Sequence, residues 1–323
     1  MTADPTRRAL LKLAGASSMM MAAVAAVRAE GGGESTAAGP TFASWTPIRI
    51  GMMTLRVNDP DKVSAFYRDV IGLSVLQRTE TIVRLGAGGV PLVELEARPD
   101  ASRESPRAAG LFHTAFLMPT RKDLARWLVH VARNRTPLTG FADHNVSEAV
   151  YLDDPEGNGV EVYADRAPEL WQWRDGSVKM GTEQLDVDDL VALTDTRSSN
   201  YAAAPDGLRI GHVHLKVGDV GQASGFYAGL IGLNPTRMID RAAFLSSGRY
   251  HHHIGANSWR SAGAGRRDES TTGLSWFSFE VKSDDGLARH EERLCQAGAA
   301  LTVLSNGLET ADPWGTKVRL IRV

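Results

Sequence analysis

Alternating apolar and polar positions open the first half of the chain. Residues 53–57 (Met-Thr-Leu-Arg-Val) alternate with the period of two that is typical of a half-buried strand. After Asp59 the apolar spacing changes to that of an amphipathic helix. Short strands are expected next, around residues 82–85 and 92–96. The helix residues that share its apolar face are Val63, Phe66 and Tyr67. Together these elements form one βαβββ unit.

A second unit of the same plan follows. It begins with an apolar strand at 111–116 and continues into a helix at 121–133. Strands are expected at 149–152 and 160–163. The residues between them, Asp-Pro-Glu-Gly-Asn-Gly at 154–159, have the composition of a tight turn. The first half of the chain therefore contains two βαβββ units.

The second half repeats the first. Residues 210–233 match residues 50–73 at a constant offset, with 11 of 24 positions identical. A further unit starts at 274–281, and a last strand is expected at 318–323. Internal repeats of this kind indicate duplicated supersecondary units. The predicted fold class is α+β, with four βαβββ modules in curled mixed sheets.

The ends of the modules divide the chain into five segments. Residues 1–29 carry Arg7-Arg8 before an apolar run that ends in small residues, which is typical of a twin-arginine-type signal peptide. The other expected segments are a flexible tether at 30–47, a first half at 48–165, an ordered connection at 166–207 and a second half at 208–323. We therefore expect export to the periplasm or beyond, and no membrane contact after the signal is cleaved. An ordinary secretory signal or an uncleaved anchor is the alternative.

Composition narrows the chemistry further. With 36 Lys and Arg against 38 Asp and Glu, the formal charge is −2, so no basic surface points to nucleic acid. The single cysteine, Cys295, excludes an internal disulfide and a multi-thiolate metal site. Any metal must therefore be held by histidine and carboxylate side chains.

Several motifs resemble the vicinal oxygen chelate superfamily, which includes glyoxalases, bleomycin resistance proteins and extradiol dioxygenases. They are the Ile-Gly-x-x-x-Leu strand, Phe-Tyr followed by Ile-Gly-Leu, and Asp-Pro-Glu-Gly-Asn-Gly-Val-Glu. Three segments are similar to the catechol 2,3-dioxygenase-like branch: residues 143–148, 173–190 and 250–255. The resemblance covers about residues 48–323. It implies paired βαβββ units that curl into cups, one of which holds a divalent metal.

In extradiol dioxygenases, the resemblance implies two histidines and one glutamate as metal ligands, a set that suits Fe(II). The matching residues here are His113, Glu161 and His212. The equivalent positions in the first and fourth modules are Met52, Trp276 and Arg319. Neither half has a complete ligand set, so we expect modules two and three to pair across the halves into one metal cup. Modules one and four would form a metal-free cup, which departs from the family's usual pairing of consecutive C-terminal modules.

Other residues are candidates through the same resemblance. Tyr151, ten residues before the glutamate, matches a tyrosine near the substrate, and His252 matches an active-site acid–base histidine. His144 is expected to line the same pocket, while Glu94 and His214 are reserve ligands.

Each of these residues also has a purely structural interpretation. His113 or His212 could be a buried histidine bonded within the core, Glu161 a surface-strand carboxylate, and Tyr151 a core aromatic residue. The run His251–His253 could be a surface patch, since at most two of its members can face one way on a strand.

The sequence favours an exported, metal-dependent extradiol dioxygenase. Fe(II) is the expected cofactor, with Mn(II) or another divalent metal as alternatives, and the expected partners are a catechol-like aromatic diol and dioxygen. A non-catalytic small-molecule binder and a glyoxalase-like metal isomerase or hydrolase remain open on the same fold. The sequence leaves the substrate, the metal and a homo-oligomeric state undecided.

Overall fold

The computed structural model describes residues 41–197 and 200–323. The expected signal peptide at 1–29 lies outside the described residues, as does most of the tether. Within the described ranges, no helix is both long enough and apolar enough to cross a membrane. The architecture consists of two eight-stranded mixed sheets, each built from both halves of the chain.

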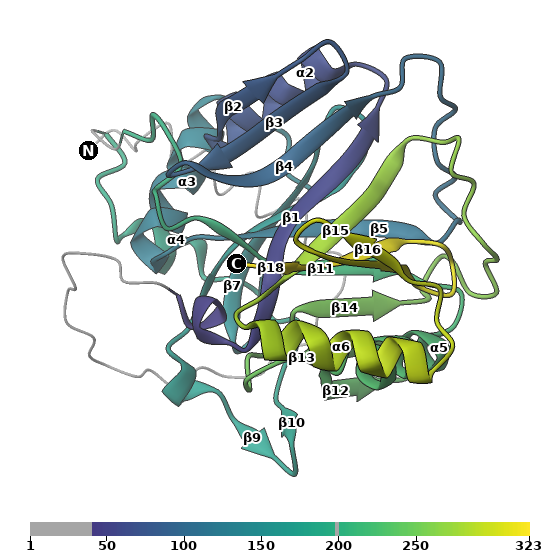
Figure 1. Cartoon of the computed structure of the whole chain (residues 1–323). Helices are drawn as coiled ribbons and strands as arrows, with labels where there is room; N and C mark the ends of the chain where they lie inside the picture. Colours follow the sequence, from purple (N-terminus) through teal and green to yellow (C-terminus); the bar gives the residue numbers. More distant parts are fainter. Residues whose placement is uncertain (1–40, 198–199) are drawn as a thin grey trace.

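The first sheet joins modules one and four (Figure 1). Its strands, in the order in which they lie side by side, are β16 (Thr302–Leu304), β17 (Gly307–Ala311), β18 (Lys317–Arg322), β15 (Gly273–Val281), β1 (Ile48–Val57), β4 (Val90–Ala97), β3 (Ile82–Ala87) and β2 (Ser74–Arg78). The two modules meet where β1 pairs antiparallel with β15.

The second sheet joins modules two and three, as the split ligand set predicts. Its strands, in order, are β12 (Asn234–Ile239), β13 (Ala242–Ser246), β14 (Ile254–Asn257), β11 (Arg209–Lys216), β5 (Gly110–Leu117), β8 (Gly159–Asp165), β7 (Ser147–Asp153) and β6 (Gly140–Asp143). The two modules meet where β5 pairs antiparallel with β11.

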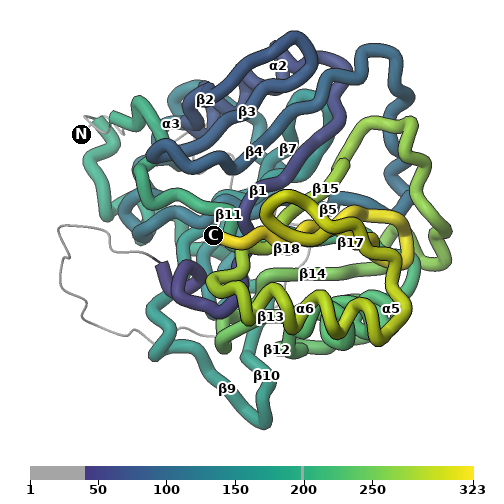
Figure 2. Tube along the Cα trace, viewed as in Figure 1, coloured from purple at the N-terminus to yellow at the C-terminus, as the bar shows by residue number. Residues whose placement is uncertain are grey.

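Helices cover the sheets. They are η1 (Phe42–Trp45), α2 (Pro60–Phe66), α3 (Arg121–Arg133), η3 (Pro168–Leu170), α4 (Val187–Val191), α5 (Val220–Ser224) and α6 (Asp284–Gln296). Asp59 and Asp219 cap α2 and α5 through their side chains, and both helices continue as π-helical turns, η2 (Tyr67–Ile71) and η4 (Gly225–Leu230). The repeat at the sequence level is therefore a repeat of local structure. Figure 2 follows the chain through both sheets to its C-terminus beside β18.

The two sheets pack through their central strands, since β1 contacts β11 and β15 contacts β5. One face of each strand enters the shared apolar core, where Met53 and Phe116 are fully buried. The Thr114 hydroxyl lies 2.7 Å from the sulfur of Met53. Because side chains alternate along a strand, His113 on β5 points to the opposite, concave face of the second sheet.

The described residues of the connection between the halves include short elements that pack against the second sheet. It contains the short hairpin β9 (Trp173–Arg174) and β10 (Ser177–Val178), which extends from the lower edge of the molecule in Figure 1. Trp171 is buried and donates from its indole nitrogen to the carbonyl of Arg166. β10 contacts β12, and residues 143 and 183 form a bridge beside β6. The connection thus reaches both edge strands of the second sheet.

Candidate metal centre

A turn sets the register of the strand that carries the candidate carboxylate. Asp154 is buried, and its Oδ1 accepts the backbone N–H groups of Glu156 and Asn158 at 2.8 and 2.9 Å. This closes the predicted turn between β7 and β8. In the resulting register Tyr151 lies opposite Glu161. Cross-strand neighbours share a face, so both side chains point into the concave side of the sheet.

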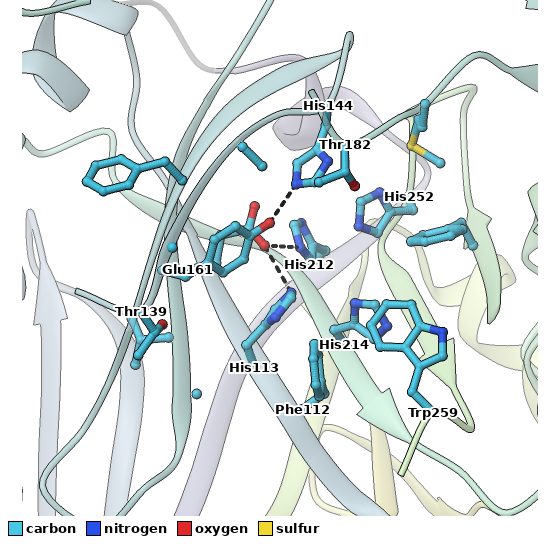
Figure 3. Close-up of a pocket in the computed structure, with 18 of the residues that line it drawn as sticks. Phe112, His113, Thr139, His144, Glu161, Thr182, His212, His214, His252 and Trp259 are labelled. Atoms are coloured by element: carbon cyan, nitrogen blue, oxygen red, sulfur yellow. Dashed lines mark hydrogen bonds and ion pairs between the residues drawn. The ribbon is translucent and has the colours of Figure 1, made fainter. Parts of the chain in front are cut away.

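Three predicted ligands converge on that concave face. The Nε2 atom of His113 lies 2.9 Å from Oε2 of Glu161, and the Nε2 atom of His212 lies 3.2 Å from the same oxygen. One ligand atom from each residue falls within 4.8 Å of the other two. Figure 3 shows dashed lines from the Glu161 carboxylate to both imidazoles, with β5, β8 and β11 supplying one residue each. Residues 99 positions apart are thus brought together by the cross-half pairing of β5 with β11.

The protonation states of this group suit metal binding. Burial lowers the pKa of His212 to about 4, against the opposing attraction of Glu161. The pKa of Glu161 lies well below its usual value, because the attraction of His212 and His113 outweighs the cost of burying the carboxylate. Near neutral pH the site therefore offers a neutral imidazole and an ionised carboxylate, the forms that bind metals.

An unsatisfied nitrogen atom also indicates a metal ion at this position. His113 Nε2 is buried and makes no hydrogen bond of acceptable geometry, although Glu161 lies close to it. Buried polar atoms are rarely left without a partner. Two histidines and one carboxylate form the facial set that binds non-haem Fe(II) and leaves coordination positions open. The residues present therefore fit such a cation.

Tyr151 and His144 form a hydrogen-bonded chain with the connecting segment. His144 Nδ1 lies 2.6 Å from the carbonyl oxygen of Gly181, and its Nε2 lies 2.6 Å from the Tyr151 hydroxyl. The Tyr151 ring lies 5.6 Å from that of His113, measured between centroids. Burial raises the pKa of the Tyr151 hydroxyl well above its usual value, as does the negative charge of Glu161. The hydroxyl is therefore un-ionised at neutral pH and lies beside the candidate ligands.

The three consecutive histidines are buried, so the surface-patch interpretation is wrong. They precede β14 instead of lying on it, which frees them from strand alternation. The ring of His252 lines the cavity, 4.1 Å from the ring of His212. Its Nδ1 lies 2.8 Å from Nδ1 of His251, whose Nε2 lies 2.8 Å from a carboxylate oxygen of Asp165. Burial, with the neighbouring histidines, lowers the pKa of His252 well below its usual value.

The two reserve ligands have other partners. The amide of Asn257 lies 3.0 Å from Nε2 of His214, and the His214 ring packs 4.9 Å from that of His113. Glu94 lies in the first sheet, where it pairs with Arg84 at 2.5 Å and accepts a hydrogen bond from Thr54. Neither belongs to the group around Glu161.

The concave face of the first sheet is chemically different from that of the second. Arg319, at the position equivalent to Glu161, lies 3.8 Å from the centre of the Trp276 ring and pairs with Glu309 at 2.7 Å. A cation–π contact and ion pairs therefore occupy the face on which the second sheet presents imidazoles.

A cavity of about 900 Å³ opens above the candidate ligands. Its lining is largely aromatic near the base, through residues such as Phe112, Phe244 and Trp259. The connecting segment supplies another wall, with Met180 and Thr182 among the lining residues. The sequence comparison of the halves did not identify this wall, because the segment belongs to no module. Its one signal was the similarity of residues 173–190 to the catechol 2,3-dioxygenase-like branch.

Comparisons with known proteins agree with this geometry. Residues 49–162 match the family described as Glyoxalase/Bleomycin resistance protein/Dioxygenase superfamily. A catechol-2,3-dioxygenase from Bacillus subtilis (strain 168) is 35% identical over 269 residues, which cover 82% of this chain and 93% of the relative. The chain therefore belongs to this superfamily, among its extradiol dioxygenase enzymes.

Solved structures confirm the fold. A putative dioxygenase from Bacillus subtilis superposes with a TM-score of 0.59 at 12% identity, over 86% of this chain and 85% of that one. Glyoxalase I from Zea mays superposes with a TM-score of 0.53 at 14% identity, over 87% and 94% of the two chains. At these identities the likeness concerns the fold alone, which hosts more than one chemistry.

Proposed function

We propose that the protein cleaves the ring of a catechol or related vicinal aromatic diol by extradiol dioxygenation, with Fe(II) held by His113, Glu161 and His212. The observation that carries the proposal is the convergence of these three side chains at the base of an aromatic-lined cavity. The B. subtilis relative, a catechol-2,3-dioxygenase, supports the substrate class. When bound, the iron supplies Lewis-acid and one-electron chemistry, with open positions for a diol and dioxygen.

The chain's own residues orient the substrate and move its protons. Phe112 and Phe244 line the cavity near the candidate ligands, where they pack against the aromatic ring of the substrate. The Tyr151 hydroxyl hydrogen-bonds a diol oxygen. His252 is neutral at neutral pH and accepts the proton of a diol hydroxyl as a general base. Desolvation by the surrounding walls strengthens each of these interactions.

The test is ring cleavage by the purified protein after anaerobic loading with Fe(II). We expect oxygen uptake and the absorbance of a ring-fission product with catechol, both abolished by His113→Ala and by Glu161→Gln. Glu309→Gln is the matched control, because Glu309 is an ion-paired strand carboxylate of the other sheet. Turnover that is unaffected by the two site variants would overturn the ligand assignment. Turnover that needs Zn(II) or Ni(II) and no oxygen would identify an isomerase or hydrolase instead.

We further propose that residues 1–29 direct export through a twin-arginine route, on the basis of Arg7-Arg8 and the apolar run after them. This segment can be fused to a reporter that fluoresces only when it has folded before export. We expect periplasmic fluorescence that is lost when Arg7 and Arg8 are both changed to Lys. A Lys12→Gln fusion is the control for the loss of a single nearby charge. Export that survives the double change would contradict the proposal.

A further inference from the structure

Beyond the diol itself, we propose that the substrate carries an anionic ring substituent, a carboxylate or sulfonate, which binds Arg237 and Arg260. This inference rests on the proposed function, because it assumes that the diol binds at His113, Glu161 and His212. The anionic substituent is the part of the substrate that points away from those residues.

Arg237 lies on the inner side of the cup. It belongs to β12, the edge strand of the second sheet, and is directly paired with Phe244 on β13. Directly paired residues of antiparallel strands share a face, and both residues line the cavity. The Phe244 ring lies 5.1 Å from that of His252. Arg237 is therefore one side chain further from the reacting end of the cavity than Phe244.

Arg260 lines the same cavity from a different segment, the loop that follows β14. Its neighbour Trp259 packs 5.4 Å from the ring of Phe112 and 5.7 Å from the ring of His214. Arg241 holds this loop by donating to the backbone carbonyl oxygen of Trp259 at 2.8 Å. The loop is thereby attached to the β12–β13 hairpin, which also carries Arg237.

The charge of these two arginines is not balanced locally. Over the part of the chain that the structure describes, neither guanidinium has a hydrogen-bond or ion-pair partner. The acidic residues that line the cavity are Glu161, among the candidate ligands, and Asp153. Asp153 lies at the end of β7, near the other edge of the sheet. The cavity is therefore lined by two arginines that no ion pair neutralises.

The space and the wall between the two ends suit a substituted ring. A cavity of about 900 Å³ is near the upper end of the usual size range for small-molecule sites and exceeds what a bare diol needs. Trp259 contacts the aromatic base, precedes Arg260 in the chain and is 42% exposed. Arginine binds carboxylate and sulfonate oxygens through a planar fork of donors. A ring substituent with a short apolar linker that ends in an acid would therefore contact Trp259 first and an arginine at its end.

The experiment compares 3,4-dihydroxyphenylpropionate with its methyl ester, which has nearly the same shape but no charge. Ring cleavage by the Fe(II)-loaded protein and calorimetric binding are measured for both compounds. The proteins are wild type, Arg237→Met, Arg260→Met and the double variant. Arg174→Met is the control, because it removes the same charge from a side chain that is 95% exposed and outside the cavity.

We expect the acid to be preferred over the ester by about tenfold in kcat/KM, the effect of a partly solvated charge-assisted bond. The double variant should lose this preference for the acid over the ester, and Arg174→Met should keep the preference. Equal use of acid and ester by wild type would overturn the inference and leave the proposed dioxygenase intact. If neither compound is cleaved, the proposed function fails. In that case preferential binding of the acid, lost in the double variant, would still support the anion site.

Discussion

The Nε2 atom of His144 lies 2.6 Å from the hydroxyl oxygen of Tyr151. The other ring nitrogen of His144 faces the carbonyl oxygen of Gly181, which can only accept a hydrogen bond. Nδ1 of His144 must therefore carry a proton, and in the neutral ring Nε2 is the acceptor. With this tautomer the Tyr151 hydroxyl donates a hydrogen bond to His144, and its oxygen lone pairs remain available. Under the proposed function His144 is therefore a positioning residue, since it acts through Tyr151.

Tyr151→Phe removes this hydroxyl and keeps the ring that packs beside His113. We expect kcat for ring cleavage to fall by about tenfold or more, because a buried hydrogen bond near the reacting atoms is lost. The unfolding temperature should change by only a few degrees. Tyr201→Phe is the matched control, since its buried hydroxyl donates to the carbonyl of Ile71 at 2.8 Å, away from the cavity. An equal loss of activity in both variants would contradict a specific role for Tyr151.

Glu161→Gln should separate metal binding from folding. In metal-free protein we expect its free energy of unfolding to fall by up to about 3 kcal/mol, because the attraction of His212 and His113 outweighs the desolvation cost of the buried carboxylate. Fe(II) at about 100 times its dissociation constant should stabilise wild type by about 2.7 kcal/mol and leave the variant unchanged. Chemical denaturation with and without metal measures both quantities. Metal stabilisation that persists in Glu161→Gln would place the metal elsewhere.

Gly159 begins β8 at a point where no side chain fits. A Cβ atom there would lie 2.2 Å from the backbone oxygen of Phe112 and 3.2 Å from the Cβ of His113. Gly159→Ala should therefore destabilise the fold by about 2 kcal/mol or more and reduce metal affinity, because β5 must shift. Gly229→Ala is the control, since nothing lies within 4 Å of its added carbon. There we expect a small gain of about 0.4–1 kcal/mol. Denaturant unfolding curves measure the change in the free energy of unfolding for both variants. Equal changes in the two would contradict the close approach of β8 to β5.

His253 makes stability depend on pH. Burial lowers its pKa to about 3, with help from the neighbouring His251. Its Nδ1 accepts a hydrogen bond from the backbone N–H of Ser247 at 3.2 Å. If Nδ1 were protonated, its N–H would face the N–H of Ser247, and the two donors would repel each other. Since the unfolded chain binds the proton near pH 6.5 and the folded chain only near pH 3, stability is complete above pH 6.5 and falls as pH decreases through that window.

From His253 alone we expect the free energy of unfolding to fall by about 2 kcal/mol between pH 7 and pH 5. The slope is about 1.4 kcal/mol per pH unit once the pH is well below 6.5. Denaturant unfolding at a series of pH values measures it. His253→Gln should show a shallower decline than wild type over this range. Parallel pH profiles for the two proteins would rule out His253 as the source.

Much of this architecture could be predicted because it repeats. The constant offset between residues 50–73 and 210–233 located two modules, and the absence of ligands at Met52 and Trp276 indicated which modules share a cup. The histidine run could not be placed in the same way. Whether His251 and His253 are buried depends on packing by Trp171 and Thr46, which come from segments outside the modules. A local pattern carries no information about such distant neighbours.

The pairing of β5 with β11 has a consequence for how the protein is made. During synthesis, the strands with His113 and Glu161 emerge from the ribosome well before the strand with His212. Until β11 arrives, the second sheet has an open edge at β5, and only two of the three candidate ligands are present. Under the proposed ligand set, a metal ion is bound only late, after both halves have been translated. The order of strands along the chain then couples metal loading to the completion of folding.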